Sequence, residues 1–188
     1  MHRREGIEVL LYYYDLYRVI VKMKCKYCPK CGKELELKEI GDEGNMPYCP
    51  SCDVPYFNIF NTCVIVTVIN DDKIALVKQY RLTEKYWILI AGYINEGETA
   101  EETVKREVQE ETGVPVKDCK YISSYFHKRG YNLMLGFIAF VDDEKFSTSR
   151  EIDEIRWFKI EEAEDHLKEG TIAYEHFCNM KGYLKKQD

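Results

Sequence analysis

Three glutamates stand close together in one stretch of the chain, at positions 107, 110 and 111. Spacings of three and four residues place side chains on one side of an α-helix, so Glu107, Glu110 and Glu111 are expected to share a face. Like charges crowded on a helix destabilise it. Mg²⁺ prefers oxygen ligands and completes its shell with substrate phosphates. The spacing therefore leaves two interpretations, a solvated acidic surface or a magnesium site for phosphate chemistry.

The sequence around these glutamates contains signals that begin and end a helix. Thr99 followed by Glu102 forms a capping box, which satisfies free backbone N–H groups of the first turn. Gly113 suits the left-handed position after a helix, and Pro115 cannot continue one. Apolar residues recur at every fourth position, as in a stripe that packs on a sheet: Ala100, Val104 and Val108. We therefore predict a helix over 99–112 that carries the glutamates.

Four of the eight cysteines form two matching CxxC units. The units are Cys28-Pro-Lys-Cys31-Gly and Cys49-Pro-Ser-Cys52. Their spacing predicts a closed, tetrahedral Cys₄ zinc site, which is structural rather than catalytic. Cys25 forms a further CxxC with Cys28 and is an alternative ligand, and a disulfide or redox role is the other interpretation. Residues 25–56 contain few large apolar side chains, so this segment needs a bound metal or a disulfide to fold.

The rest of the chain contains patterns of strands and helices that interleave. Apolar runs of strand length predict β-strands at 63–69, 73–80, 87–90, 131–141 and 155–160. Two further helices are expected, at 161–169 and 173–184. Because the order is not a strict βαβ repeat, we predict an α+β domain with a mixed sheet covered by helices. The expected organisation is an N-terminal segment of undecided role (1–24), a zinc ribbon (25–58) and a larger domain (59–188).

The overall composition excludes some classes of protein. The net charge of −6 argues against a general DNA-coating role, which needs a basic face to displace counterions. The apolar run at the start of the chain is interrupted by Asp15 and Arg18, so neither a secretory signal nor a membrane span is expected. Four of the eight cysteines lie in CxxC pairs of the kind that bind metal as free thiols. We therefore expect the protein in a reducing compartment, the cytoplasm.

Nine positions in and before the predicted helix match one known motif. The motif is Gly, five residues, Glu, seven residues, then Arg-Glu-aliphatic-any-Glu-Glu-any-Gly-aliphatic. Its members here are Gly92, Glu98, Arg106, Glu107, Val108, Glu110, Glu111, Gly113 and Val114. The chain therefore resembles the Nudix hydrolases. This resemblance implies an α/β/α sandwich and Mg²⁺-dependent (or Mn²⁺-dependent) attack of water on a pyrophosphate bond in a nucleoside-diphosphate compound.

The Nudix resemblance also implies roles for individual residues. Glu107, Glu110 and Glu111 would bind the divalent ions together with the carbonyl group of Ala91. One of the three, preferably Glu110, would also position or deprotonate the attacking water. The residues that would hold the backbone and the helix in place are Gly92, Glu98, Arg106 and Gly113.

A zinc ribbon directly before such a domain is similar to the NADH pyrophosphatase branch of these hydrolases. That branch cleaves NAD(H) to nicotinamide mononucleotide and AMP and is commonly homodimeric. By position, Glu151 matches a further metal ligand, Tyr93 an aromatic that stacks on a base, and Ala173 a substrate contact. An exposed loop carboxylate is the alternative for Glu151, because Glu154 is nearby.

One segment departs from the branch. Where NADH pyrophosphatases carry a Ser-Gln-Pro-Trp-Pro-Phe-Pro-type array, this chain has a basic, aromatic stretch at 124–130 that keeps only Ser124. We expect a loop there, in which Lys128 and Arg129 contact phosphates or are simply solvated. ADP-ribose or another nucleoside diphosphate is therefore an alternative substrate, and a non-catalytic nucleotide sensor is a further alternative. Nucleic acid is expected as a partner only in the form of NAD-capped RNA.

Overall fold

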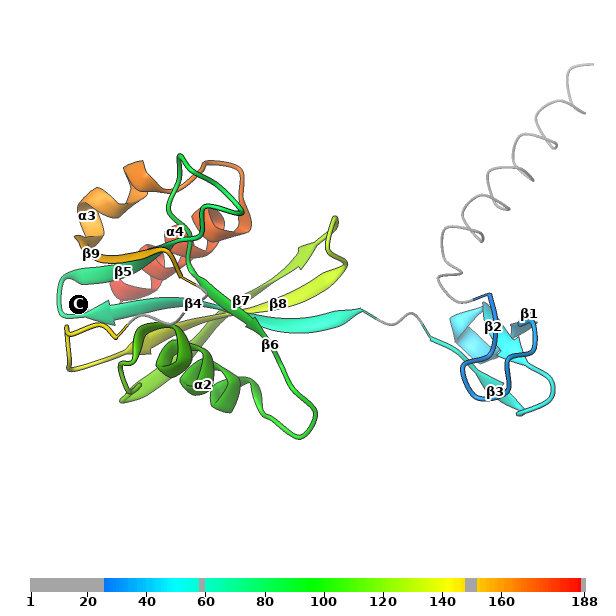
Figure 1. Cartoon of the computed structure of the whole chain (residues 1–188). Helices are drawn as coiled ribbons and strands as arrows, with labels where there is room; N and C mark the ends of the chain where they lie inside the picture. Colours follow the sequence, from blue (N-terminus) through cyan, green and yellow to red (C-terminus); the bar gives the residue numbers. More distant parts are fainter. Residues whose placement is uncertain (1–25, 58–59, 148–151, 187–188) are drawn as a thin grey trace, which may run out of the picture. The chain divides into compact units, whose positions relative to one another are not determined.

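The structure is a computed structural model of the chain that describes residues 26–57, 60–147 and 152–186. The segment 1–24, Cys25 and Glu151 lie outside the described residues. The chain divides into two compact units, Met1–Ile59 and Phe60–Asp188, and each is described by itself (Figure 1). None of the helices in the described ranges is long and apolar enough to cross a membrane.

The first unit contains a small antiparallel sheet. Its strands are β1 (Glu36–Glu39), β2 (Asn45–Cys49) and β3 (Val54–Pro55), in the order β1-β2-β3, and a 3₁₀ turn η1 (Gly41–Glu43) joins the first two. Five described apolar residues of this unit are buried, and three of them, Cys28, Leu35 and Cys49, form one small cluster. A core of this size does not stabilise a fold alone, so this unit needs a bound metal or a disulfide between its cysteines.

The second unit is built on a mixed sheet of six strands (Figure 1). They are β4 (Asn61–Asn70), β5 (Lys73–Lys78), β6 (Ile90–Tyr93), β7 (Asp118–His127), β8 (Asn132–Phe140) and β9 (Glu154–Lys159). The order is β7-β8-β4-β5-β9, and β6 pairs with β4. β4 runs parallel to β8, whereas the other pairs are antiparallel. The predicted mixed sheet is therefore confirmed.

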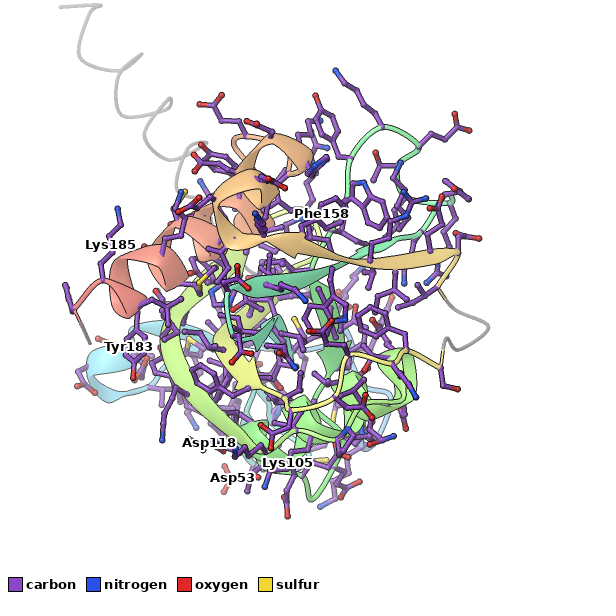
Figure 2. All side chains as sticks on the ribbon, turned by 90° about the vertical axis from the view of Figure 1, so that its left-hand side faces the viewer. Asp53, Lys105, Asp118, Phe158, Tyr183 and Lys185 are labelled. Carbon is purple, nitrogen blue, oxygen red and sulfur yellow. The ribbon has the colours of Figure 1, made fainter. Side chains whose placement is uncertain are left out.

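Helices cover both faces of this sheet. The helix α2 (Ala100–Thr112) lies on one face, and α3 (Ile160–Ala163), the 3₁₀ turn η2 (Glu164–His166) and α4 (Ile172–Leu184) lie on the other. Figure 2 shows Lys105 of α2 and Lys185, directly after α4, on opposite sides of the strands. β4 is buried on both faces, because Val64 packs with Val104 of α2 while Ile65 packs in the cluster of Phe177 of α4. The expected α/β/α sandwich is confirmed.

The strand β7 was not expected from the sequence. Residues 124–130 are predicted above as a loop, but the strand continues to His127 and only 128–131 form the turn to β8. β7 lies at the edge of the sheet, mostly exposed, and a bulge between Tyr121 and Ser123 breaks its alternation. Such a strand carries no apolar run in its sequence, so its pattern gives no strand signal.

Two other elements differ from their predicted bounds. The strand predicted at 87–90 forms instead at Ile90–Tyr93, because the ladder to β4 begins only at Ile90, and Ile88 makes an isolated bridge to Val77. The helix predicted at 161–169 ends at His166, whose carbonyl oxygen accepts a hydrogen bond from the backbone N–H of Trp87 at 3.0 Å. Leu167 then takes an extended conformation that buries its side chain in the core.

A buried polar chain fixes α4 to the sheet. His176 lies completely inside the domain, with Nε2 2.9 Å from the carbonyl oxygen of Phe137, so Nε2 carries the proton and donates. Nδ1 therefore accepts from the hydroxyl of Tyr125 at 3.1 Å, and that hydroxyl accepts from the amide of Asn179 at 2.9 Å. Burial lowers the pKa of His176 to about 4, since the charged form loses its hydration.

Candidate active site

A cleft forms where β4 changes its partner. Cys63–Val66 of β4 pair with β6, whereas Val68–Asn70 pair with β5, so the two strands diverge at this point. The cleft has a volume of about 520 Å³. It is lined by Gln79, Arg81, Leu82, Ile88, Leu89, Ala91, Gly92, Tyr93, Asn95, Glu107 and Glu111. It thus joins the connection between β5 and β6 to the helix that carries the glutamates.

The helix α2 has the ends that its sequence predicts. The side chain of Thr99 accepts a hydrogen bond from the backbone N–H of Glu102, and the carboxylate of Glu102 accepts one from the backbone N–H of Thr99. Gly113 has φ of 75° at the other end, in the left-handed region. Because both ends are fixed, the register of α2 against the sheet is fixed, and with it the position of each glutamate.

The three glutamates lie in different surroundings. Glu111 is 6% exposed and Glu107 is half-buried, and both line the cleft. The side chain of Glu110 is 59% exposed and projects to solvent. A Cβ added at Gly92 would overlap the carboxylate of Glu107, so the absence of a side chain at position 92 lets this carboxylate lie directly against β6. Carboxylate oxygens gathered beside a bare backbone are a donor set that fits a hard divalent cation such as Mg²⁺.

Arg106 connects the helix to the loop before it and to β6. Its Nε and Nη2 donate to the two carboxylate oxygens of Glu98 at 2.7 and 2.9 Å, and Nη2 also donates to the carbonyl oxygen of Tyr93 at 3.0 Å. Its Nη1 donates to Glu107 at 2.7 Å and to Glu110 at 3.1 Å. These hydrogen bonds from Arg106 lower the pKa of Glu98 to about 2. Arg106 therefore holds Glu98 ionised and orients two of the three clustered glutamates.

Only part of the predicted substrate set reaches the cleft. Tyr93 lines it and is 57% exposed, as a base-stacking side chain requires. Ser124 lies on β7, in the row Ser124–Leu135–Val64–Gly92, which places it three strand spacings, about 14 Å, from Gly92. Ala173 belongs to α4, on the face opposite α2. Lys128 and Arg129 lie in the turn between β7 and β8.

The connection between β5 and β6 contributes residues that sequence reasoning missed. Arg81 is the cation in the described lining of the cleft, Gln79 and Leu82 of the same connection line it as well, and Asn95 joins them from the loop after β6. Arg81 is exposed and makes no ion pair with any residue in the described ranges. No local pattern in the sequence marks Arg81, because its place in the cleft depends on how β5 and β6 pair with β4.

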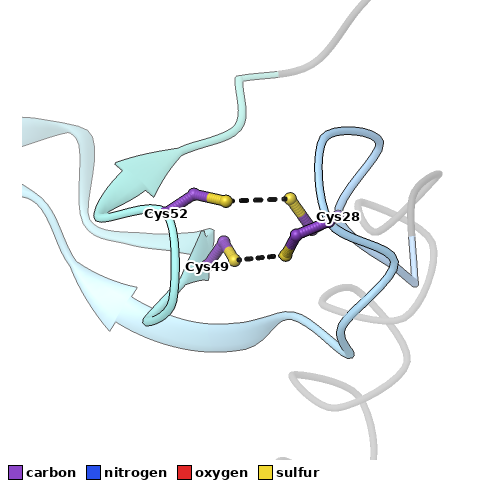
Figure 3. Close-up of side chains that lie close together, drawn as sticks. Cys28, Cys49 and Cys52 are labelled. Carbon is purple, nitrogen blue, oxygen red and sulfur yellow. Dashed lines mark hydrogen bonds between the residues drawn. The ribbon is translucent and has the colours of Figure 1, made fainter.

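The four cysteines of the two CxxC units come together in the first unit. The sulfur atoms of Cys28, Cys31, Cys49 and Cys52 lie within 4.8 Å of one another. Cys28 and Cys52 are 3.9 Å apart, and Cys31 and Cys49 are 3.6 Å apart (Figure 3). Zinc–sulfur bonds of about 2.3 Å in a tetrahedron give sulfur–sulfur edges of about 3.8 Å. The four thiols therefore fit a zinc ion.

The two CxxC units have the same backbone geometry. The N–H of Gly32 donates to the carbonyl of Cys28 at 2.8 Å, and the N–H of Asp53 donates to the carbonyl of Cys49 at 2.9 Å. Both Gly32 and Asp53 have a left-handed φ, of 74° and 55°. Glycine takes this conformation freely, whereas Asp53 is held there by a hydrogen bond from the hydroxyl of Tyr48.

Comparisons with known proteins agree with this geometry. The chain is 34% identical over 137 residues to "NAD-capped RNA hydrolase NudC" of Stutzerimonas stutzeri, covering 72% of this chain and 49% of that protein. It is 30% identical over 162 residues to the protein of the same name from Vibrio atlanticus, covering 86% and 59%. The chain thus spans about half the length of the curated relatives it matches.

A solved structure and a family match extend these comparisons. The crystal structure of a NUDIX hydrolase from Nitrosomonas europaea superimposes with a TM-score of 0.67 at 23% identity, covering 87% of this chain and 92% of that one, and shows the same fold. Residues 60–178 match the family described as NUDIX domain. With the motif and the sandwich in place, and with Glu107 and Glu111 in the cleft, the chain belongs to the Nudix family.

Proposed function

We propose that this chain hydrolyses the pyrophosphate bond of an NAD-type dinucleotide, giving nicotinamide mononucleotide and AMP. The observation that carries the proposal is the cleft in which Glu107 and Glu111 lie beside the bare backbone at Gly92. A water oxygen bonds to one phosphorus, the bridging P–O bond breaks, and the proton of the water leaves to a base. The relatives named as NAD-capped RNA hydrolases support the dinucleotide as the substrate.

The chain would hold Mg²⁺ or Mn²⁺ through Glu107, Glu110, Glu111 and the carbonyl of Ala91, with Glu151 as a further ligand. Bound there, such an ion polarises the phosphate oxygens and lowers the pKa of the attacking water. From the family resemblance, Glu110, which accepts a hydrogen bond from Nη1 of Arg106 beside Glu107, would position or deprotonate the attacking water. Arg106 keeps Glu110 and Glu107 in place while that proton is transferred.

The surroundings of the cleft suit a nucleotide diphosphate. Tyr93 offers an exposed ring at the cleft edge for stacking on a base, and Arg81 supplies a positive charge for the phosphates. Ser124 lies about 14 Å from Gly92 and outside the cleft lining, and the rest of the NADH pyrophosphatase array is absent from the sequence, so ADP-ribose is the second candidate substrate. A nucleotide sensor without catalysis is the remaining alternative.

We further propose that Cys28, Cys31, Cys49 and Cys52 bind a structural zinc ion. The spacing of the thiols and the matching turns of the two CxxC units support this proposal. A homodimer, from the family resemblance, and a cytoplasmic location, from the paired cysteines, stay predictions. Light scattering on the purified protein and fractionation of cells test them.

The test is a hydrolysis screen with Mg²⁺ or Mn²⁺ over NADH, NAD⁺, ADP-ribose, NAD-capped RNA, nucleotide sugars and nucleoside triphosphates, with the products identified. Glu107→Gln and Glu111→Gln should each lower kcat by about 100-fold or more, because several kcal/mol of charge stabilisation are lost. Glu101→Gln, an exposed change on the same helix, is the matched control. Tight binding of one nucleotide without turnover of any substrate would favour the sensor instead.

A further inference from the structure

Three aromatic rings gather at one end of the large sheet. Phe126, at the end of β7, makes edge-to-face contacts with Phe60, at a centroid distance of 6.0 Å, and with Tyr131, at 5.3 Å. Phe126 is 45% exposed and Phe60 is 43% exposed. Edge-to-face packing holds each ring against its neighbours while leaving ring faces open to solvent. The contacts join the β7–β8 hairpin, which carries Phe126 and Tyr131, to Phe60, directly before β4.

The same end of the sheet is basic. His127, Lys128 and Arg129 follow Phe126 directly and are exposed. Within the described part of the chain, neither Lys128 nor Arg129 has a carboxylate partner. Lysines at the other end of the same strand pair are neutralised, because Lys117 pairs with Asp142 and Lys120 with Asp118. We call Phe60, Phe126, Tyr131, His127, Lys128 and Arg129 the aromatic–basic tip.

The aromatic–basic tip lies on the catalytic side of the sheet. Phe126 pairs with Leu133, which pairs with Thr62, one position from the Cys63–Tyr93 pair at the cleft edge. Phe126 also shares its face with Ser124, whose row reaches Gly92, and so with α2. Phe126 therefore stands three strand spacings, about 14 Å, across the sheet from β6. The side chain of Tyr93 points to the other face, because its partner Cys63 is one position from Thr62, so a ligand meets the tip when it leaves the cleft past Gly92 on the α2 face.

We propose that the aromatic–basic tip binds the first nucleotides of a single-stranded RNA whose 5′ end is the dinucleotide in the cleft. Open ring faces stack on bases regardless of sequence, and Lys128 and Arg129 contact the phosphates between them. Two cations without carboxylate partners beside open ring faces match the alternating phosphates and bases of a single strand, and this surface continues the face on which the dinucleotide would lie. The inference rests on the proposed function, since it places the RNA as the continuation of the dinucleotide.

The test separates binding from catalysis by using an RNA of about 10 nucleotides with a 5′-hydroxyl end, which contains no pyrophosphate bond to cleave. Its Kd is measured by fluorescence anisotropy with Mg²⁺ present. Phe126→Leu keeps an apolar side chain but removes the ring, and should weaken binding about 5-fold or more. Phe126→Trp should restore it. Tyr121→Leu, at an exposed aromatic further along β7, is the matched control and should bind as the wild type does.

The salt dependence of RNA binding tests the charged residues of the aromatic–basic tip. The double variant Lys128→Ala/Arg129→Ala should reduce the slope of log Kd against log salt by about 1.4, the value for two lost single-strand phosphate contacts. Lys117→Ala/Lys120→Ala removes the same charge at the far end of the strands and should leave most of the slope intact. Equal losses in both double variants would mean that only net charge matters and would overturn the proposal.

Comparing NADH hydrolysis with RNA binding distinguishes a failure of the aromatic–basic tip from a failure of the proposed function. Phe126→Leu should hydrolyse NADH at the wild-type rate while losing RNA affinity, because the ring lies outside the cleft. A wild-type protein that hydrolyses NADH but does not bind the 5′-hydroxyl RNA would overturn the role of the tip and leave the proposed function standing. A protein that binds this RNA through Phe126 without hydrolysing any dinucleotide would instead overturn the proposed function. Thermal unfolding of each variant confirms that the fold is intact.

Discussion

The carboxylate of Glu107 occupies the space that a side chain at Gly92 would fill. Gly92→Ala should therefore push this carboxylate away from β6 without unfolding the domain, because the obstructing atoms are the end of a flexible side chain. We expect kcat to fall by about 100-fold, as for loss of a preorganised charge. The melting temperature should change by only a few degrees.

A second glycine provides the control. Gly182 lies in α4 with open space where a Cβ would stand. Gly182→Ala should leave turnover unchanged and stabilise the domain by about 0.5–1 kcal/mol, since alanine loses less backbone entropy in a helix. If Gly92→Ala retained full activity, Glu107 would not act from the position it has against β6.

Arg106→Lys tests the hydrogen bonds that orient the glutamates. A lysine keeps the charge but cannot donate at once to Glu98, Glu107 and the carbonyl of Tyr93. Loss of such orienting partners costs about 10–100-fold in metal affinity or activity, so the Mg²⁺ concentration for half-maximal rate should rise by that factor. Arg156→Lys, at the exposed ion pair with Glu154 on β9, should leave the Mg²⁺ titration unchanged.

The buried His176 makes stability depend on pH. Its pKa is about 4 in the folded protein because burial disfavours the charged form, whereas the ordinary value is 6.5. Between these values the unfolded chain binds a proton that the folded chain does not, so stability falls as pH drops from 6.5 to 4. The loss is at most about 3 kcal/mol, from 1.36 kcal/mol per unit.

Urea unfolding at several pH values measures this dependence. His176→Gln retains an amide that can donate to the carbonyl of Phe137, and it should flatten the dependence between pH 6.5 and 4. His127→Gln removes an exposed histidine and serves as the control. An unchanged slope in His176→Gln would show that other groups cause the acid sensitivity.

Arg81→Ala tests the cation that the cleft contributes to substrate binding. The cleft already holds two carboxylates, so a diphosphate needs a positive partner there. Hydrogen bonds to charged groups contribute about 1.5–3 kcal/mol, and KM should rise by about 10-fold or more with little change in kcat. Lys85→Ala, which removes an exposed cation of the same connection outside the cleft lining, should leave KM unchanged.

Cys49→Ser tests the metal site of the first unit. The buried sulfur of Cys49 is one of the four clustered thiols, and a serine hydroxyl is a poor zinc ligand. We expect elemental analysis to show the loss of the one zinc ion per chain and proteolysis to cut within residues 26–57. Cys178→Ser, at an exposed cysteine of α4, should retain the metal. Wild-type protein purified without chelator and free of zinc would contradict the assignment.

Sequence reasoning succeeded where the signals are local. The ends of α2 follow from Thr99, Glu102 and Gly113, whose side chains or backbone act within one turn of the helix. The cysteine cluster follows from two short CxxC units. The caps of α2 act between chain neighbours, whereas the two CxxC units lie 18 residues or more apart and are recognised because each unit carries its own local signature.

The missed features depend on contacts between distant segments. β7 is an exposed edge strand with a bulge, and its ladder depends on β8 rather than on an apolar pattern of its own. Arg81 enters the cleft only because β4 pairs first with β6 and then with β5. The distance of Ser124 from Gly92 likewise follows from strand order, which composition does not encode.

Because β4 pairs with β6 and β5 in different parts of its length, changes in the wall of the cleft are independent of changes in the strand beside the carboxylates. The connection between β5 and β6 is closed by reciprocal backbone hydrogen bonds between Val77 and Ile88, at 3.0 and 2.9 Å. Insertions, deletions or substitutions between these two residues alter the wall of the cleft but leave the ladder at Ile90–Tyr93 in register. Substrate choice can therefore diverge among descendants of this chain while the arrangement of carboxylates that performs the chemistry is inherited unchanged.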